Sequence, residues 1–165
     1  MKQISFRNDI LPLKNQLFRL ALRITLNKED AEDVVQDTLI KVWNKRDSWE
    51  QIDSIEAYTL KICRNLALDH IKLHDNQNLS IDSDEVQEPH TDAMAHILQR
   101  DKVNVVKSLI DSLPEKQKTT LQLREFEGKS YKEISLVLGI SEDQVKINIF
   151  RARQTIKKQF EKLDD

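Results

Sequence analysis

The chain is poor in the residues that form tight turns and disulfides. Its 165 residues include two glycines, three prolines and one cysteine. So little glycine and proline leaves few sites for the hairpin turns that an all-β fold requires. The lone cysteine excludes an internal disulfide and fits a reducing compartment. No apolar run approaches the roughly 18 residues of a membrane-spanning helix, so we expect a helix-rich cytoplasmic protein without membrane insertion.

The chain also lacks an excess of basic residues. It has 26 Lys and Arg against 28 Asp and Glu, which gives a net charge of -2, and its sequence pI is about 6.1. Proteins that bind DNA tightly without a partner are usually more basic. Any nucleic-acid role must therefore depend on local basic patches or on a partner that supplies further contacts.

Three segments of the first half carry apolar residues at three- and four-residue spacing, the pattern of amphipathic helices. The first follows Pro12, the second runs from Asn27 to about residue 45, and the third runs from about Ile55 to Leu73. Asn27 and Asp30 have the spacing of an N-cap, and Asp53 or Ser54 is expected to cap the third helix. The lone Cys63 lies beside the apolar stripe of that helix, so we expect it to be a small buried hydrophobe.

A change in composition marks a linker between two helical domains. Residues 73–99 contain six acids and no Lys or Arg, and such a stretch cannot bury enough apolar surface to fold alone. We therefore predict an all-α chain of two small helical domains joined by a flexible acidic linker. The expected boundaries are 1–74, 75–92 and 93–165, with helix resuming near Asp92.

Four helices are predicted in the C-terminal domain. Its first helix spans about Ile97–Ser112 and should turn five apolar residues inward: Ile97, Val103, Val106, Leu109 and Ile110. Pro114 then opens a short helix through Glu125, because a missing N–H costs little in a first helical turn. Gly128 follows that helix region, as expected for a glycine near a C-cap.

A helix-turn-helix pattern follows. Ser130–Glu133 and Ser141–Gln144 each have the spacing of a capping box, which marks a helix start, and Gly139 lies between them. Glycine adopts the positive φ that a tight turn between two helices needs. The two helices should bury one shared core: Ile134, Leu138, Ile140, Val145 and Ile149. The alternative is an αα-hairpin without a ligand, but seven bases against three acids over residues 129–158 favour DNA binding.

Beyond this motif, the chain resembles the extracytoplasmic-function sigma factors, the two-domain members of the sigma-70-like family that direct bacterial RNA polymerase to promoters. Residues 30–43, DAEDVVQDTLIKVW, resemble the family's helix that binds core polymerase. Residues 54–72, SIEAYTLKICRNLALDHIK, resemble its promoter-melting helix, and residues 113–153 resemble its C-terminal promoter domain. Three blocks in the family's order are more specific than a helix-turn-helix alone.

The resemblance implies roles for three sets of exposed residues. The face of residues 30–43 that would bind the coiled coil of the largest polymerase subunit carries Asp33, Gln36, Asp37 and Ile40. The face of the third helix that would lie along the minus-ten element carries Lys61, Arg64, Asn65, Leu68 and Lys72, although solvated charge is the alternative for both faces. The recognition helix would read the minus-thirty-five element through Lys146, Ile147, Asn148, Phe150, Arg151 and Arg153. A membrane-bound anti-sigma factor is a further partner that is common in the family.

Trp49 and the pair of histidines in the third helix each allow two interpretations. Trp49 lies in the loop that, by resemblance, traps an unstacked base, so it either stacks on that base or fills the core of the domain. His70 and His74 have a spacing that suits two metal ligands, but no third ligand is evident, so we expect no metal site and no cofactor.

Three functions compete. A sigma factor needs core polymerase and promoter DNA as partners. A stand-alone helix-turn-helix regulator would need a symmetric dimer, for which the sequence shows no heptad seam, and a helical adaptor would bind protein alone. We find no P-loop, nucleophile elbow or zinc-protease motif, so we expect that the chain is not an enzyme. The net charge of -2 favours the sigma factor, because polymerase then supplies phosphate contacts that this chain lacks.

Overall fold

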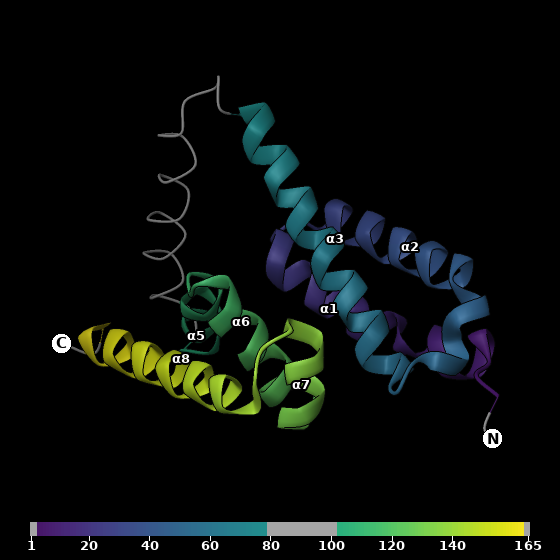
Figure 1. The fold of residues 1–165 in the computed structure, drawn as a ribbon. Helices are drawn as coiled ribbons and strands as arrows, with labels where there is room; N and C mark the ends of the chain where they lie inside the picture. Colours follow the sequence, from purple (N-terminus) through teal and green to yellow (C-terminus); the bar gives the residue numbers. More distant parts are fainter. Residues whose placement is uncertain (1–2, 79–101, 164–165) are drawn as a thin grey trace.

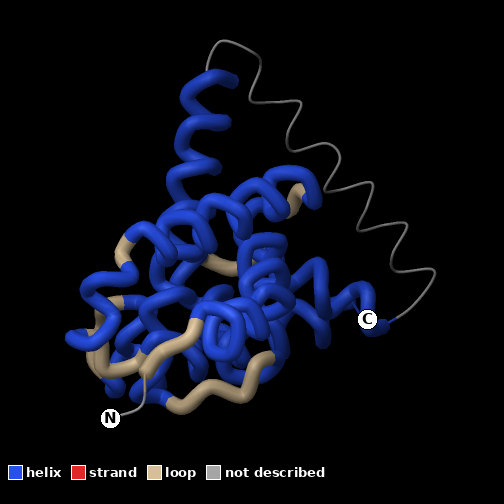
Figure 2. The backbone as a smooth tube through the Cα atoms, turned by 90° about the vertical axis from the view of Figure 1, so that its right-hand side faces the viewer, coloured by secondary structure: helices blue, strands red, loops and turns tan. Residues whose placement is uncertain are grey.

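The computed structural model describes residues 3–78 and 102–163, and every regular element in these two ranges is a helix. Figure 2 shows the described backbone as helices joined by short loops, with no strand. The expectation of an all-α chain with two helical domains is therefore confirmed. In the same two ranges, no helix is both long enough and apolar enough to cross a membrane.

The N-terminal domain consists of three main helices and three short ones. The short π-helix η1 (Phe6–Ile10) and 3-10 helix η2 (Leu11–Leu13) lead into α1 (Lys14–Thr25). Helix α2 (Lys28–Asn44) is followed by the 3-10 helix η3 (Arg46–Gln51) and then by α3 (Ile55–Asn78). Local caps set these starts: the Asn27 side chain accepts from the Asp30 N–H (2.9 Å), and the Ser54 hydroxyl accepts from the Ala57 N–H (3.1 Å).

Helix α3 is longer than the sequence predicts, because its predicted end is near Leu73. Helix α3 continues to Asn78, so the first residues of the predicted linker are helical. Each residue added to a helix forms one further backbone hydrogen bond. Helix α3 can therefore extend beyond the last residue of its apolar stripe. The rest of the predicted linker, the helix expected near Asp92, and Ile97 all lie outside the described residues.

The C-terminal domain begins, in its described part, with α5 (Lys102–Asp111), α6 (Glu115–Leu121) and the π-helix η4 (Gln122–Phe126). Pro114 is the N-cap of α6, as expected from its position. One inward residue of the first helix was predicted wrongly: Val103 is 60% exposed, whereas Val105 is buried. Leu109 and Ile110 complete the buried face of α5, and Ile110 packs in one cluster with Ala152 of the last helix.

The helix-turn-helix is confirmed by its local geometry. It consists of α7 (Tyr131–Leu138) and α8 (Glu142–Leu163), separated by Gly139 with a φ of +68°. The Ser141 hydroxyl accepts from the Gln144 N–H, while the Gln144 side chain accepts from the Ser141 N–H, both at 3.2 Å. This reciprocal pair is the capping box that the sequence predicts. The shared core also forms as expected: Ile134, Leu138, Val145 and Ile149 are buried, and Ile140 packs against them.

The two domains share one hydrophobic core. A continuous cluster of buried side chains includes Leu17 of α1, Val34 of α2 and Leu60 of α3, together with Ile134 and Val137 of α7. Figure 1 shows how this arises: α7 lies against the first half of α3, and α6 lies beside α1. The sequence predicts two domains on a flexible tether, whereas the structure packs them directly against each other.

Cys63 lies within this shared core and is buried, as expected. Its thiol donates to the Leu17 carbonyl (3.4 Å), and burial raises its pKa to about 12. Only the thiolate is nucleophilic, so a thiol reagent at pH 8 should label the native protein very slowly. Labelling should become fast and complete in denaturant. Fast labelling of the native chain would place Cys63 outside the core.

Candidate nucleic-acid interface

Helix α8 presents an exposed face on the side away from its buried residues. With 3.6 residues per turn, the buried Val145 and Ile149 lie opposite Ile147 and Phe150. Ile147 is 46% exposed and Phe150 is 63% exposed, and Arg151 is exposed beside them. Large apolar residues at this exposure, next to a cation, have the chemistry to meet a thymine methyl and a guanine or phosphate.

Three other predicted residues of α8 contact groups of their own domain. The Asn148 side chain donates to the Gln144 carbonyl (2.8 Å), and Lys146 lies over the Tyr131 ring at 5.7 Å. Arg153 forms an ion pair with Glu125 of η4. Separating the exposed Arg153 and Glu125 side chains costs little free energy, because surface ion pairs contribute only about 0–1 kcal/mol to stability. These side chains can therefore be redirected toward DNA without unfolding the helix.

The predicted minus-ten face of α3 is only partly exposed. Lys61, Asn65 and Lys72 are exposed, as expected. Arg64 is not: it is 8% exposed, and its guanidinium binds both carboxylate oxygens of Glu115, at 2.6 and 2.8 Å. The prediction of an exposed Arg64 is therefore wrong for this conformation. Leu68, predicted on the same face, is half-buried and packs against the shared core.

Trp49 fills the core of the N-terminal domain. It is 7% exposed, and its indole N–H donates to the Val42 carbonyl (3.1 Å). Its ring also meets Trp43 edge-on, with centroids 6.2 Å apart. Both the apolar ring and the polar N–H are satisfied inside the protein, as buried tryptophan usually requires. The base-stacking alternative is thus wrong for this conformation, and the core alternative holds.

The predicted polymerase-binding face of α2 forms one surface. Asp33, Gln36, Asp37 and Ile40 follow the spacing i, i+3, i+4 and i+7, which places them on one side of the helix, and all four are exposed. Ile40 is 58% exposed and continues into an apolar hollow lined by Phe6, Leu39 and Trp43. The surface therefore combines carboxylates at one end with an open apolar area at the other.

One group of side chains resembles a metal site but lacks the features of one. Asp30, Asp33 and His70 each place one ligand atom within 4.8 Å of the others. The side chain of His74, the other histidine considered from sequence, is outside the described residues. The three side chains are half-exposed or exposed, and a protein site that supplies only three open ligands leaves the rest of the coordination to water. We therefore assign no metal to this group.

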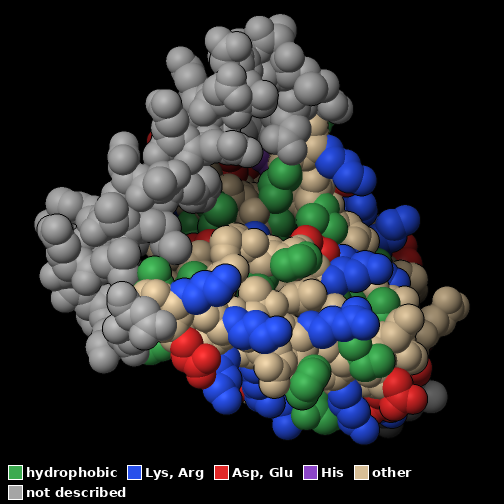
Figure 3. Space-filling view, turned by 90° about the vertical axis from the view of Figure 1, so that its left-hand side faces the viewer, with side chains coloured by type: hydrophobic (Ala, Val, Ile, Leu, Met, Phe, Trp, Pro, Cys, Tyr) green, Lys and Arg blue, Asp and Glu red, His purple; other side chains and the backbone are tan. Residues whose placement is uncertain are grey.

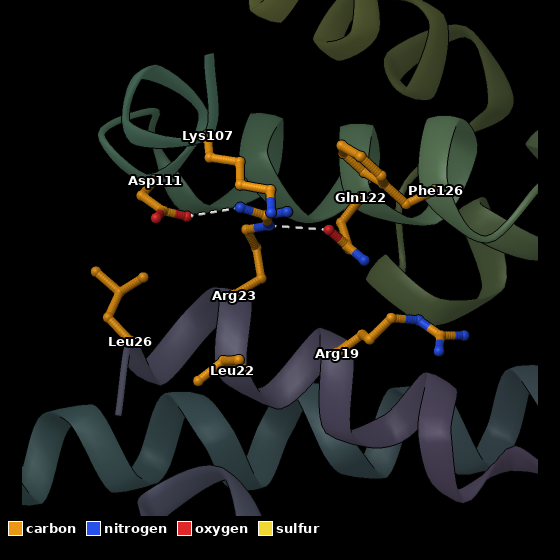
Figure 4. Close-up of a pocket in the computed structure, with 8 residues that line it drawn as sticks. All are labelled: Arg19, Leu22, Arg23, Leu26, Lys107, Asp111, Gln122 and Phe126. Carbon is orange, nitrogen blue, oxygen red and sulfur yellow. Dashed lines mark hydrogen bonds and ion pairs between the residues drawn. The ribbon is translucent and has the colours of Figure 1, made fainter. Parts of the chain in front are cut away.

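A cavity of about 670 Å³ opens between the domains. It is lined by residues of α1 and its C-cap on one side and of α5 and η4 on the other (Figure 4). Arg23 crosses this cavity from α1 toward Asp111 and Gln122, while Leu22, Leu26 and Phe126 supply apolar walls. Its lining carries no nucleophile and general base in contact, so the cavity has no evident catalytic chemistry.

Two family models match the chain in order. The Sigma-70 region 2 model matches residues 10–76, and the Sigma-70, region 4 model matches residues 104–156. The chain belongs to the sigma-70 family. Together the two models cover more than half of it and include α2, most of α3, and α7 with most of α8, so the resemblance seen in the sequence is confirmed.

The relatives of this sigma factor include other bacterial RNA polymerase sigma factors. It is 29% identical to the RNA polymerase sigma-H factor of Pseudomonas aeruginosa, over 94% of this chain and 86% of that one. It is 26% identical to the ECF RNA polymerase sigma factor SigM of Bacillus subtilis, over 87% of each chain. The ECF RNA polymerase sigma factor SigE of Mycolicibacterium smegmatis is 30% identical over 87% of this chain, which spans 56% of that relative.

Solved structures show the same fold. One is the sigma factor RpoE of Bartonella quintana in complex with the anti-sigma factor NepR, with a TM-score of 0.74, 24% identity and coverage of 97% of this chain and 98% of that one. Another is CnrH in complex with the cytosolic domain of CnrY, with a TM-score of 0.69, 21% identity and coverage of 94% and 87%. At these identities the likeness establishes the fold of this sigma factor.

Sequence reasoning missed the ionic residues between the domains. Arg19 and Arg23 of α1, and Glu115 and Glu127 of the C-terminal domain, all form interdomain ion pairs. In the sequence they are exposed charges on amphipathic helices, which are usually solvated. Nothing local distinguishes a charge that meets water from one that meets a residue about a hundred positions away.

Proposed function

We propose that this sigma factor binds core RNA polymerase through α2 and directs it to promoters through α3 and α8, in the cytoplasm. The match of both sigma-70 regions, in order along one chain, is the observation that carries the proposal. A stand-alone regulator would require only the second region, so the presence of the first favours the sigma factor.

The exposed face of α2 has the chemistry to bind the basic coiled coil that the family resemblance names. Asp33 and Asp37 lie on the same exposed side of the helix, ready to form charge-assisted hydrogen bonds with Lys or Arg. The apolar area around Ile40 and Trp43 would be covered in the same contact, which explains why it is tolerated on the surface. Carboxylates would then set the orientation while the apolar area supplies affinity.

Promoter DNA would meet two separate surfaces. Figure 3 shows one side of the molecule on which Lys and Arg side chains dominate over Asp and Glu, with hydrophobic side chains between them. We assign Lys61, Asn65 and Lys72 of α3 to the minus-ten element, and the exposed face of α8 to the minus-thirty-five element. Cations would hold phosphates, while the apolar residues of α8 would meet base edges.

The compact structure must open for both contacts to form at once. The two promoter elements are centred about 25 base pairs apart, which is about 85 Å of DNA at a rise of about 3.4 Å per pair. A compact chain of this length has a radius of gyration of about 15 Å. The domains would therefore separate when the polymerase complex forms on a promoter. The solved structures of RpoE with NepR and of CnrH with CnrY support an anti-sigma factor as a further partner of this chain.

Run-off transcription tests the function directly. Genomic DNA from the source organism is transcribed by core polymerase with and without this protein, and the transcripts are sequenced. We expect a discrete set of new start sites with shared upstream sequences. Transcript starts that are unchanged by the protein would reject the sigma-factor proposal, whereas DNA binding without core polymerase would favour a stand-alone regulator.

The contribution of α8 can be measured with Arg151→Ala. If Arg151 reads a base, the substitution should cost about 1–3 kcal/mol in promoter binding, with the loss confined to one position of the upstream element. If it holds a phosphate, binding should weaken uniformly and the salt slope should fall by about one. Lys162→Ala, near the far end of the same helix, is the control. Full activity of Arg151→Ala on every promoter, with an unchanged slope, would exclude this face from the DNA.

A further inference from the structure

Among residues 3–78 and 102–163, four ion pairs join the two domains. In three of them an arginine of the N-terminal domain meets an acid of the C-terminal domain: Arg19 with Glu127, Arg23 with Asp111, and Arg64 with Glu115. The fourth has the opposite sense, because Lys129 binds Glu56 of α3. The pairs and the shared hydrophobic core join the same two domains, so charge and apolar packing together hold the domains closed.

The pairs of α1 are linked to each other. Arg23 donates to Asp111 (2.9 Å) and to the side-chain oxygen of Gln122 (2.8 Å), as Figure 4 shows. The side-chain nitrogen of Gln122 in turn donates to Glu127 (3.1 Å), which receives two hydrogen bonds from Arg19. A connected network of this kind fixes the orientation of α1 against α5 and η4.

The pair of Arg64 with Glu115 is bidentate and half-buried. Two parallel N–H groups of the guanidinium bind the two carboxylate oxygens, and the Thr119 hydroxyl donates to one of the same oxygens (2.9 Å). Burial alone would raise the pKa of Glu115, but the hydrogen bonds and charge of Arg64 outweigh it and hold that pKa below its usual range. Glu115 is therefore a well-satisfied anion in the closed protein.

A phosphate of DNA would bind Arg64 in the same way. The planar guanidinium of arginine donates the same two N–H groups to the oxygens of a carboxylate or of a phosphate. Arg64 lies on α3 with Lys61 and Asn65, the exposed residues that we assign to the minus-ten element. One guanidinium cannot hold Glu115 and a phosphate in this geometry together, so the closed structure and DNA compete for it.

We propose that Glu115 is an internal competitor of DNA for Arg64, so that the free protein holds its two domains closed and blocks part of its own promoter-binding surface. The proposal rests on the proposed function, because it needs the α3 face to bind DNA. Separation of the domains exposes Arg64, and in the promoter-bound complex a DNA phosphate takes the place of Glu115. The acid of one domain thus regulates a DNA contact of the other.

Binding of the free protein to DNA tests this competition. The probe is a short fluorescent duplex of random sequence, because a phosphate contact needs no particular base, and no polymerase is added. Glu115→Gln removes the competing charge but keeps the size of the side chain. It should bind the duplex about tenfold tighter than the unmodified chain, the effect of releasing one charge-assisted pair. The slope of affinity against salt should steepen by about one.

Four further variants isolate the cause. Glu161→Gln makes the same change in net charge on an exposed residue near the end of α8, and should leave the affinity unchanged. Arg64→Ala and the double variant Arg64→Ala/Glu115→Gln should bind with equal affinity, because Glu115 has nothing to release once Arg64 is gone. Circular dichroism confirms that each variant is folded, and Glu115→Asp, whose shorter side chain weakens the pair, should give a smaller gain in the same direction.

The competing outcomes separate this proposal from the proposed function. No gain for Glu115→Gln and Glu115→Asp, an equal gain for Glu161→Gln, or a gain that persists without Arg64 would each overturn the competition. None of these results would decide the outcome of the run-off transcription assay, which requires polymerase. Conversely, failure of run-off transcription would reject the sigma-factor function even if Glu115→Gln binds DNA more tightly.

Discussion

Reversing one charge, in Asp37→Lys, is expected to abolish assembly of this protein with core RNA polymerase. Asp37 lies at the centre of the exposed face of α2, between Asp33 and Ile40. A lysine there would set a cation against the basic partner that we propose. Breaking a buried, hydrogen-bonded charge pair costs about 2–5 kcal/mol, which is a loss of affinity of about 30-fold to several thousand-fold.

The measurement is co-purification with core polymerase, followed by titration of the labelled variant. Because the Asp37 side chain is exposed, the thermal unfolding of Asp37→Lys should match that of the unmodified chain within about 0.5 kcal/mol. Glu161→Lys makes the same charge change near the end of α8 and should still assemble. Assembly of Asp37→Lys with normal affinity would exclude this face of α2 from the polymerase contact.

The second large effect is expected for Trp49→Ala, in stability. Removal of a buried Trp costs about 3–5 kcal/mol, a large part of the roughly 5–15 kcal/mol that stabilises a domain. The indole fills the space beside Val42 and Trp43 and also satisfies the Val42 carbonyl. Trp49→Phe keeps most of the apolar contact and loses the hydrogen bond, so it should cost less.

Urea unfolding, monitored by circular dichroism, gives the free energies of unfolding of Trp49→Ala and Trp49→Phe. The base-stacking alternative makes the opposite prediction: Trp49→Ala would fold with normal stability, and the polymerase complex would fail to open promoter DNA. Equal stability of Trp49→Ala and the unmodified chain would therefore return Trp49 to the DNA-binding surface. A large loss of stability, smaller in Trp49→Phe, would keep it in the core.

The features that sequence predicts correctly are those fixed by nearby residues. The caps at Asn27, Ser54 and Ser141 form because each side chain reaches a backbone group three residues away. Gly139 has the positive φ that its turn needs. Burial of the helix-turn-helix core follows from the 3.6-residue period, which depends on a few turns of helix.

The features that sequence predicts wrongly depend on distant residues. The charge of Arg64 places it on the polar face of α3, and its burial results from Glu115, which is 51 positions further along the chain. Trp49 lies in a segment that reads as a polar loop, yet η3 turns its ring toward Trp43. The closeness of the two domains arises in the same way, since shared burial of α3 and α7 leaves no local pattern in either helix.

Packing of α3 against α7 must be broken before any partner that needs separated domains can bind. The free energy of this opening weakens the binding of every such partner. Apparent affinity equals intrinsic affinity multiplied by the fraction of molecules in the competent conformation. If about one molecule in a hundred is open, a partner of the open form binds about a hundredfold more weakly than its contacts alone would allow. Buried residues such as Val137 can therefore set how much of this protein is needed to activate transcription, without touching polymerase or DNA.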